Sequence, residues 1–223
     1  MTAYSQPVPI ADRRARVARR WLAAAIVLVA MIPLSVAFVD RPVAEFVHAT
    51  LIPYRRFFDA LTHIVDPFHA FASLFLLWTL FQLARGAHLS RIEDVLLRLS
   101  ISVAVSVMIK DQLKWAFGRT WPETWVQNNP SFFSNGTYGF FPFHGGQGWY
   151  SFPSGHTTVI CAATAVLWMR WPRGRPLYAA LGLAVVVGLI GADYHWVSDI
   201  CAGAALGIAV GLVAANFGVR PAS

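Results

Sequence analysis

The chain has 223 residues, of which 57% are hydrophobic and 13% are charged, and its formal net charge at pH 7 is +7. A soluble globular domain carries about 25% charged residues, so this composition excludes an ordinary soluble protein and indicates a membrane protein. The positive charge comes from two lysines and from arginines that cluster at the ends of apolar runs, which favours membrane orientation over nucleic-acid binding.

The chain begins with a polar and basic segment, residues 1–20, which is rich in arginine. An apolar run follows at 21–39 and is long enough to cross the hydrocarbon core of a bilayer. A cleaved secretory signal is the alternative, but the apolar part is long for one, so a retained first transmembrane helix is favoured. Residues 40–65 mix charged, aromatic and proline residues and are predicted to lie at the membrane interface.

The rest of the chain alternates apolar runs with short polar turns, which predicts an all-α fold. Two of these turns, at residues 85–91 and 170–175, are rich in arginine. The predicted transmembrane helices after the first are 67–83, 92–109, 156–169, 177–192 and 198–217. Together with the first they predict a polytopic membrane bundle of six helices, a single domain over residues 21–217.

Residues 110–153 differ from the apolar runs, because they combine glycine, asparagine and proline with many aromatic residues. A loop of this length in a compact protein is typically functional, and its aromatic content argues against disorder. With six spans, the N-terminus, both arginine turns and the C-terminus fall on one side, which the positive-inside rule makes cytoplasmic. The loop 110–153 is then extracytoplasmic.

His195 and Asp199 lie four residues apart at the start of the last predicted helix, so their side chains share one helix face. A carboxylate beside an imidazole fixes its tautomer and makes one ring nitrogen a better nucleophile or base. The alternative is a pair that only caps a helix emerging from the membrane. The cost of ionisable groups near membrane depth favours the functional interpretation.

Residues 151–156 read Ser-Phe-Pro-Ser-Gly-His and directly precede the fourth predicted helix. Proline and glycine bend the backbone there, so Ser154 and the free N–H groups of the helix N-terminus face one place, an arrangement that binds anions. His156 beside them is suited to protonate a leaving group. The alternative is an N-capped helix with an interfacial histidine.

Lys114 and Arg119 place two cations at the exit of the third predicted helix, where they suit a phosphate or, alternatively, lipid headgroups. With six spans, these cations and both histidine clusters reach the same outward face. Two histidines, one supported by a carboxylate, together with cations and a helix N-terminus, are the groups that metal-independent phosphoryl transfer requires. The sequence therefore predicts one phosphate-transfer site.

The three clusters resemble the motifs of the type 2 phosphatidic acid phosphatase family, whose core is shared with vanadium haloperoxidases. The family pattern is Lys-x6-Arg-Pro, then Pro-Ser-Gly-His, then Ser-Arg-x5-His-x3-Asp. Residues 153–156 match the second motif in full. His195 and Asp199 match the end of the third motif, and Lys114 and Pro122 match the first at the expected separation. The resemblance extends from the second predicted helix to the last.

The resemblance implies a role for each matching residue, and it implies that no metal or other cofactor takes part. These roles are nucleophile for His195, orienting carboxylate for Asp199, general acid for His156, and phosphate binding for Lys114, Ser154 and Gly155. Two positions depart from the pattern, because Trp121 and Leu189 stand where the family has phosphate-binding arginines. Arg119 is predicted to reach the site from the loop and to replace the missing cations.

The sequence thus predicts a metal-independent lipid phosphatase of the inner membrane, with a lipid phosphate as substrate and an extracytoplasmic site. The substrate candidates are phosphatidic acid, phosphatidylglycerophosphate, undecaprenyl pyrophosphate and lipid A phosphates. Two alternatives stay open: a lipid phosphotransferase of the sphingomyelin-synthase kind, whose members lack the same arginines, and a non-catalytic member with a decayed site. No nucleic-acid partner is expected, and the sequence identifies no protein partner.

Overall fold

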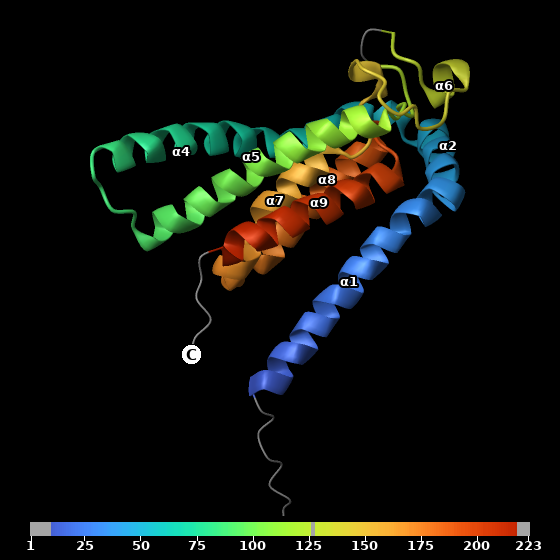
Figure 1. The fold of residues 1–223 in the computed structure, drawn as a ribbon. Coiled ribbons are helices and arrows are strands. Elements are labelled where there is room, and N and C mark those ends of the chain that lie inside the picture. Colours follow the sequence, from blue (N-terminus) through green and yellow to red (C-terminus); the bar gives the residue numbers. More distant parts are fainter. Residues whose placement is uncertain (1–9, 126–127, 218–223) are drawn as a thin grey trace, which may run out of the picture.

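The computed structural model describes residues 10–125 and 128–217 (Figure 1). Within these residues every regular element is a helix, which confirms the predicted all-α class, and the loop adds only isolated β-bridges. The α-helices are α1 Ile10–Phe38, α2 Asp40–Thr50, α3 Arg55–Thr62, α4 Asp66–Ala84, α5 Arg91–Phe117, α6 Phe132–Asn135, α7 Gly155–Arg170, α8 Arg175–Gly191 and α9 Val197–Asn216. The 3-10 turns are η1 Ile52–Tyr54, η2 His63–Val65, η3 Gln147–Trp149 and η4 Pro172–Gly174.

Local sequence sets both ends of α5, the helix that leads into the loop. At its start, Glu93 N donates to Ser90 Oγ at 3.3 Å and Ser90 N donates to the Glu93 carboxylate at 2.6 Å, a capping box. Its C-cap is Gly118, whose φ of +56° lies in the left-handed region. A Cβ at Gly118 would lie 1.8 Å from Phe141 O, so only glycine lets the loop fold back over this helix end.

The centre of the molecule is the closely packed pair of α7 and α9. Three glycines of α9, spaced four residues apart, face α7 or its N-cap. A Cβ on Gly203, Gly207 or Gly211 would lie 2.6, 2.3 or 2.5 Å from a backbone oxygen of that neighbour. These glycines therefore let the two backbones approach each other, as small residues do between membrane helices. The helices α5 and α8 flank the pair, and α1 packs along α9.

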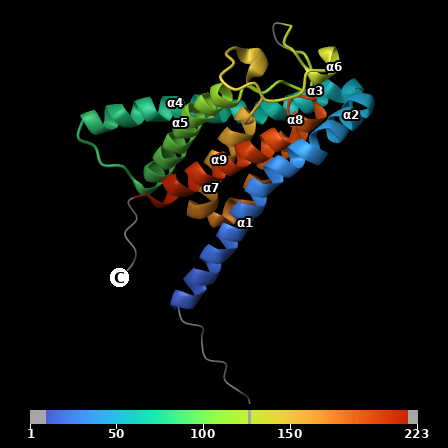
Figure 2. The ribbon, with the colours of Figure 1, turned by 45° about the vertical axis from the view of Figure 1, so that its right-hand side comes forward.

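The loop between α5 and α7, which contains α6, covers one end of this bundle (Figures 1 and 2). At the same end the chain bends by 66° between Leu22–Phe38 and Asp40–Thr50, so that α2 turns toward the loop. The helix α4 runs at an angle to the bundle before α5 returns along it (Figure 1). The start of α1 and the end of α9 lie away from the loop, toward the opposite end (Figure 1).

Each predicted transmembrane helix is present as a helix, and most boundaries agree within a few residues. Two boundaries differ. The helix α1 begins at Ile10, inside the segment predicted as a basic N-terminus, and α5 continues to Phe117, so the loop begins about eight residues later than predicted. The stretch from 110 to 117 includes four polar residues but contains no helix breaker before Gly118, which explains why the helix continues where the apolar run stops.

Three helical segments of the described chain are long and apolar enough to cross a membrane: Ile52–Ala84, Pro172–Gly191 and Val197–Asn216. The bent pair Leu22–Phe38 and Asp40–Thr50 makes a fourth if it is one broken span. The helix α7 has only 16 residues, about 24 Å at 1.5 Å per residue, which is short of a hydrocarbon core of about 30 Å. The predicted number of six spans therefore stays a prediction.

Candidate active site

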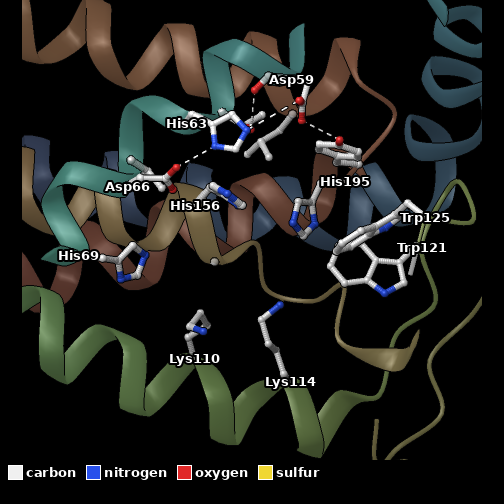
Figure 3. Close-up of a pocket in the computed structure, with 15 residues that line it drawn as sticks. Asp59, His63, Asp66, His69, Lys110, Lys114, Trp121, Trp125, His156 and His195 are labelled. Carbon is white, nitrogen blue, oxygen red and sulfur yellow. Dashed lines mark hydrogen bonds and ion pairs between the residues drawn. The ribbon is translucent and has the colours of Figure 1, made fainter. Parts of the chain in front are cut away.

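A cavity of about 440 Å³ opens at the end of the bundle that the loop covers. Figure 3 shows side chains from α5, α7 and the α8–α9 junction converging on it. These residues are Lys110, Lys114, His156 and His195. The opposite rim is formed by residues of α3, η2 and α4, namely Asp59, His63, Asp66 and His69, and the aromatic and apolar wall by Trp121, Trp125, Leu189 and Tyr194.

His195 lies in the α8–α9 junction, and its Nδ1 is 3.2 Å from Asp199 Oδ2. The same carboxylate accepts hydrogen bonds from Ser151 Oγ and from Trp196 N, the latter at 3.2 Å. With the Nδ1 proton donated to Asp199, the lone pair of His195 Nε2 is left for the cavity. Burial, only partly opposed by Asp199, lowers the pKa of His195, so its ring is neutral at neutral pH.

The N-terminus of α7 brings Gly155 and His156 to the cavity wall. Ser154 is different, because it is fully buried and does not line the cavity. Its Oγ accepts hydrogen bonds from Thr157 N at 3.5 Å and from Thr157 Oγ1 at 3.1 Å, which caps the helix. Ser154 N donates to Asp199 O at 3.0 Å, so this serine joins the starts of α7 and α9 and its hydroxyl is not placed to bind phosphate.

Two lysines lie one helical turn apart on α5, and Figure 3 shows both extending toward the histidines. Lys114 Nζ donates to Tyr150 O. Lys110 Nζ is 2.5 Å from Asp111 Oδ1, and its stem passes so near Gly155 that an added Cβ there would lie 3.2 Å from Lys110 Cδ. Sequence reasoning missed Lys110 because it ended the helix at residue 109. Its spacing of four residues from Lys114 was the available signal.

Arg119 is fully buried and does not line the cavity, although it was predicted to bind phosphate there. Its guanidinium donates to Asp199 Oδ1 at 2.6 Å, to Ser198 Oγ at 2.5 Å and to Asp40 Oδ2 at 2.6 Å. The ring centroid of Phe140 lies 4.6 Å from Arg119 Cζ. Burial opposes the charge, but the carboxylates of Asp199 and Asp40 outweigh it and raise the pKa of Arg119. The structure therefore places this cation behind Asp199, where it holds the carboxylate instead of a phosphate.

The two positions that depart from the family motifs, Trp121 and Leu189, both line the cavity. The ring centroid of Trp121 lies 4.8 Å from that of His195, and Trp121 Nε1 donates to Gln147 O at 2.8 Å. Both side chains thus form part of the cavity wall, and neither carries charge. Among the cavity residues that the structure describes, the lysines, Lys110 and Lys114, are both on α5.

The rim opposite the lysines carries charged and titratable residues that the sequence analysis did not single out. His63 Nδ1 lies 2.7 Å from Asp66 Oδ2, and His63 Nε2 lies 3.7 Å from Asp59 Oδ2. Tyr194 OH donates to Asp59 Oδ1 at 2.7 Å. The spacing of these acidic residues around His63 places them on one helical face, which was the signal in the sequence.

A separate polar group lies outside the cavity lining and joins α2, the loop and the α8–α9 junction. His48 Nδ1 is 3.0 Å from Asp193 Oδ2 and 3.4 Å from Glu123 Oε2. Burial, opposed by His48, raises the pKa of Asp193 to about 6. In the described chain this is the one group of histidine and carboxylate donors close enough together to hold a metal ion, and its members already bond to one another.

The sequence of this chain is similar to known proteins and to one known family. The family model described as the PAP2 superfamily matches residues 95–221. Two curated relatives, the lipid A 1-phosphatases of Rhizobium johnstonii and Rhizobium etli, are each 32% identical, over 109 and 106 residues. The matches cover 49% and 48% of this chain but only 42% and 43% of those relatives, so less than half of each relative is matched.

A solved structure also resembles the fold. It is the crystal structure of a transmembrane PAP2-type phosphatidylglycerolphosphate phosphatase from Bacillus subtilis, with a TM-score of 0.55 and 17% identity. The likeness covers 86% of this chain and 94% of that one, and at this identity it supports the fold alone. Because the family model matches more than half of the sequence, the chain belongs to the PAP2 superfamily, the type 2 phosphatidic acid phosphatase family that its motifs resemble.

Proposed function

We propose that this protein is a membrane lipid phosphatase that hydrolyses a phosphomonoester or pyrophosphate headgroup. The observation that carries the proposal is the convergence of His156, His195 and Lys114 on one cavity, with Asp199 bonded to the ring of His195. These groups come from three separate helical regions, and a purely structural role would not require their side chains to share a solvent-accessible cavity. The arrangement supplies a nucleophile, an acid and a cation at one place.

In the proposed reaction, the Nε2 lone pair of His195 attacks phosphorus while the bond from phosphorus to the lipid oxygen breaks. His156, entering the step protonated, gives its proton to the departing oxygen. The product is a phosphohistidine, and Asp199 stabilises the positive charge that the ring acquires. A water molecule then attacks phosphorus, His156 takes its proton, and the P–N bond to His195 breaks to release phosphate.

Lys114, Lys110 and the free N–H groups at the start of α7 are the proposed phosphate ligands. Gly155 contributes to this site through its backbone, and its missing side chain leaves room for Lys110. Lys110 thereby takes the part that the sequence assigned to Arg119. A lysine ammonium is a compact charge, whereas a planar guanidinium donates two parallel hydrogen bonds. These ligands therefore hold the phosphate less rigidly than paired arginines would.

The proposed substrate is a lipid A type 1-phosphate, because both curated relatives carry the name lipid A 1-phosphatase. Phosphatidic acid, phosphatidylglycerophosphate and undecaprenyl pyrophosphate are the other lipids to compare. In the proposed arrangement the chain crosses the inner membrane six times with both termini in the cytoplasm. The lipid tail stays in the bilayer while the headgroup enters the cavity from the extracytoplasmic face.

A lipid phosphotransferase is the second candidate function. The observation that favours it is the position of Trp121 and Leu189, which line the cavity and leave it without the motif arginines. In this case a lipid alcohol, and not water, accepts the phosphoryl group from His195. Phosphate release in the absence of any lipid alcohol excludes this alternative, whereas an acceptor-dependent lipid product supports it.

The decisive experiment uses the full chain purified in detergent with excess EDTA, and measures phosphate release from each of the four lipids. We expect release from at least one of them, and His195→Ala or His156→Ala should reduce it about a thousandfold or more. His144→Ala is the matched control, because His144 lies exposed on the loop and stacks on Trp149 with ring centroids 4.0 Å apart.

Two results would contradict the proposal. One is a strict requirement for a divalent metal, and the other is activity that survives His195→Ala. Quenching the reaction in alkali with phosphorus-labelled lipid should also trap label on the wild-type chain and none on His195→Ala. A protein without activity on any lipid, with or without an alcohol, would instead support the decayed-site reading.

A further inference from the structure

We propose that Asp40, at the bend between α1 and α2, is a positioning residue that holds the catalytic pair His195–Asp199 through Arg119 and Ser198. This inference rests on the proposed function, because it assigns a role in the same reaction. It extends beyond the family motifs, since Asp40 lies outside residues 95–221, the part of the chain that the family model matches.

Asp40 makes three contacts with the groups around Asp199. Its Oδ1 accepts the backbone N–H of Ser198 at 2.9 Å, and its Oδ2 accepts the hydroxyl of Ser198 at 2.5 Å. The same Oδ2 accepts a hydrogen bond from Arg119 at 2.6 Å. One carboxylate at the start of α2 therefore satisfies a free N–H in the first turn of α9, the helix that carries Asp199.

These contacts form a chain that leads to the reacting nitrogen. Arg119 lies between the two carboxylates, with one terminal nitrogen on Asp40 and the other on Asp199. Asp199 uses its second oxygen for His195 Nδ1. The side chains of Asp40, Arg119 and Asp199 are all 0% exposed. Water does not screen the charges of these three buried side chains. A change of charge at Asp40 therefore alters the electrostatic forces on Asp199.

Charge explains why the network needs both carboxylates. Arg119 alone beside Asp199 would form a tight pair that draws the carboxylate toward the guanidinium. Asp40 divides the attraction of the guanidinium, so Asp199 Oδ2 stays directed at His195. Tyr138 also contacts this network. Its hydroxyl lies 3.4 Å from both Arg119 and Asp40 and donates to Val36 O at 2.8 Å.

The same contacts give α1 and α2 a part in the site. Asp40 follows the 66° bend, and α1 otherwise packs along α9, so the bend is fixed by the ion pair at its corner. The N-terminal helices thereby act on catalysis without touching substrate.

The test compares three variants of the full chain in detergent: Asp40→Asn, Ser198→Ala and Glu45→Gln. Asp40→Asn keeps the shape but loses the charge. Ser198→Ala is the smaller change, removing the shared hydroxyl while leaving every charge in place, and it keeps the proposal testable if Asp40→Asn does not fold. Glu45→Gln removes an exposed carboxylate from the same helix α2 and is the matched control.

The first readout needs no substrate. Nitrogen-15 NMR of the imidazole rings, with His195 assigned through His195→Gln, should show a single Nδ1-protonated tautomer in the wild type and in Glu45→Gln. In Asp40→Asn, and to a smaller extent in Ser198→Ala, we expect a mixture of tautomers because Asp199 no longer holds the ring. A His195 signal unchanged in both folded variants would overturn the proposal, whatever the protein's substrate proves to be.

The second readout is phosphate release from whichever lipid the wild type hydrolyses. Asp40→Asn should lower kcat by about tenfold or more while KM stays within about twofold, because the network acts on the nucleophile and not on binding. A rise in KM at constant kcat would contradict a positioning role. Loss of wild-type activity in every lipid assay would count against the proposed function, and the NMR result would still decide the role of Asp40.

Discussion

At the scale of single residues, the site depends on which side of Asp199 each cation occupies. Arg119 lies behind the carboxylate and is buried, whereas Lys110 and Lys114 line the cavity in front of it. A buried guanidinium between two carboxylates is costly to disturb, because breaking such a pair leaves an uncompensated charge. A cation on the cavity wall lies where a phosphate can reach it. The two kinds of cation should therefore respond differently to substitution.

The lysines give the first prediction. Lys114→Ala should reduce kcat/KM by about a hundredfold or more, because a charged donor to the transferred phosphoryl group is lost. Lys110→Ala should raise KM with a smaller loss of kcat, since Lys110 also pairs with Asp111 at the cavity edge. Steady-state kinetics of phosphate release measure both effects. Arg85→Ala, at the remote C-cap of α4, is the matched control and should change neither constant.

A pH prediction follows from the surroundings of His195. The ring must be neutral to attack phosphorus, and burial, opposed by Asp199, lowers its pKa below the ordinary value of 6.5. His156 must be protonated and sets the alkaline limb of kcat/KM. The acidic limb, on which His195 takes up a proton, should therefore lie below pH 6.5. A pH profile of kcat/KM for the free enzyme measures this. An acidic limb centred above 6.5 would show that the ring of His195 is not buried as the structure has it.

At the scale of elements, the seam between α7 and α9 determines where the two catalytic histidines stand. His156 lies in the first turn of α7, and His195 lies two residues before the start of α9, so any separation of the two helices separates the histidines. The glycines of α9 keep the backbones in contact, and Ser154 N bonds Asp199 O across the seam. The packing and the active-site geometry are therefore one feature of the fold.

The seam gives an element-scale prediction. Gly207→Ala should destabilise the protein by about 1–3 kcal/mol, because its Cβ would lie 2.3 Å from Thr158 O and the helices must move apart. Gly182→Ala on α8 is the control, since a Cβ there meets nothing within 4 Å. Melting temperatures in detergent compare the two. Equal melting temperatures for Gly207→Ala and the wild type would mean that the helices are not in close contact.

At the scale of the whole molecule, the loop and the α7–α8 turn lie at opposite ends of the bundle (Figure 1). If the proposed orientation holds, a membrane-impermeant thiol reagent applied to intact cells should label Gly145→Cys in the loop. It should reach Arg173→Cys in η4 only after the membrane is opened. Both cysteines are placed in a chain whose free Cys161 and Cys201 have been replaced by alanine. Labelling of both sites from outside would refute the proposed orientation.

The sequence by itself determined the all-α class, the positions of the helices and the family. Hydrophobic runs bounded by arginine and glycine mark helices through local physical chemistry, and the motif around His156 and the pair His195–Asp199 are each contiguous in the chain. Lys110 was not predicted as a site residue because the apolar run ends before it. The helix α5 nevertheless continues past Lys110 to Phe117. The extension of α5 was predictable from the absence of a helix breaker, which a reading based on hydropathy overlooks.

Only the tertiary structure decided which polar side chains face the cavity. Ser154 and Arg119 carry the right chemistry for phosphate, but one caps a helix and the other is locked between Asp40 and Asp199. A side chain's partners are set by elements that are distant in sequence, and the contact between Asp40 and Arg119 spans 79 positions. No local pattern encodes such a contact, because it exists only once α2 and the loop have packed together.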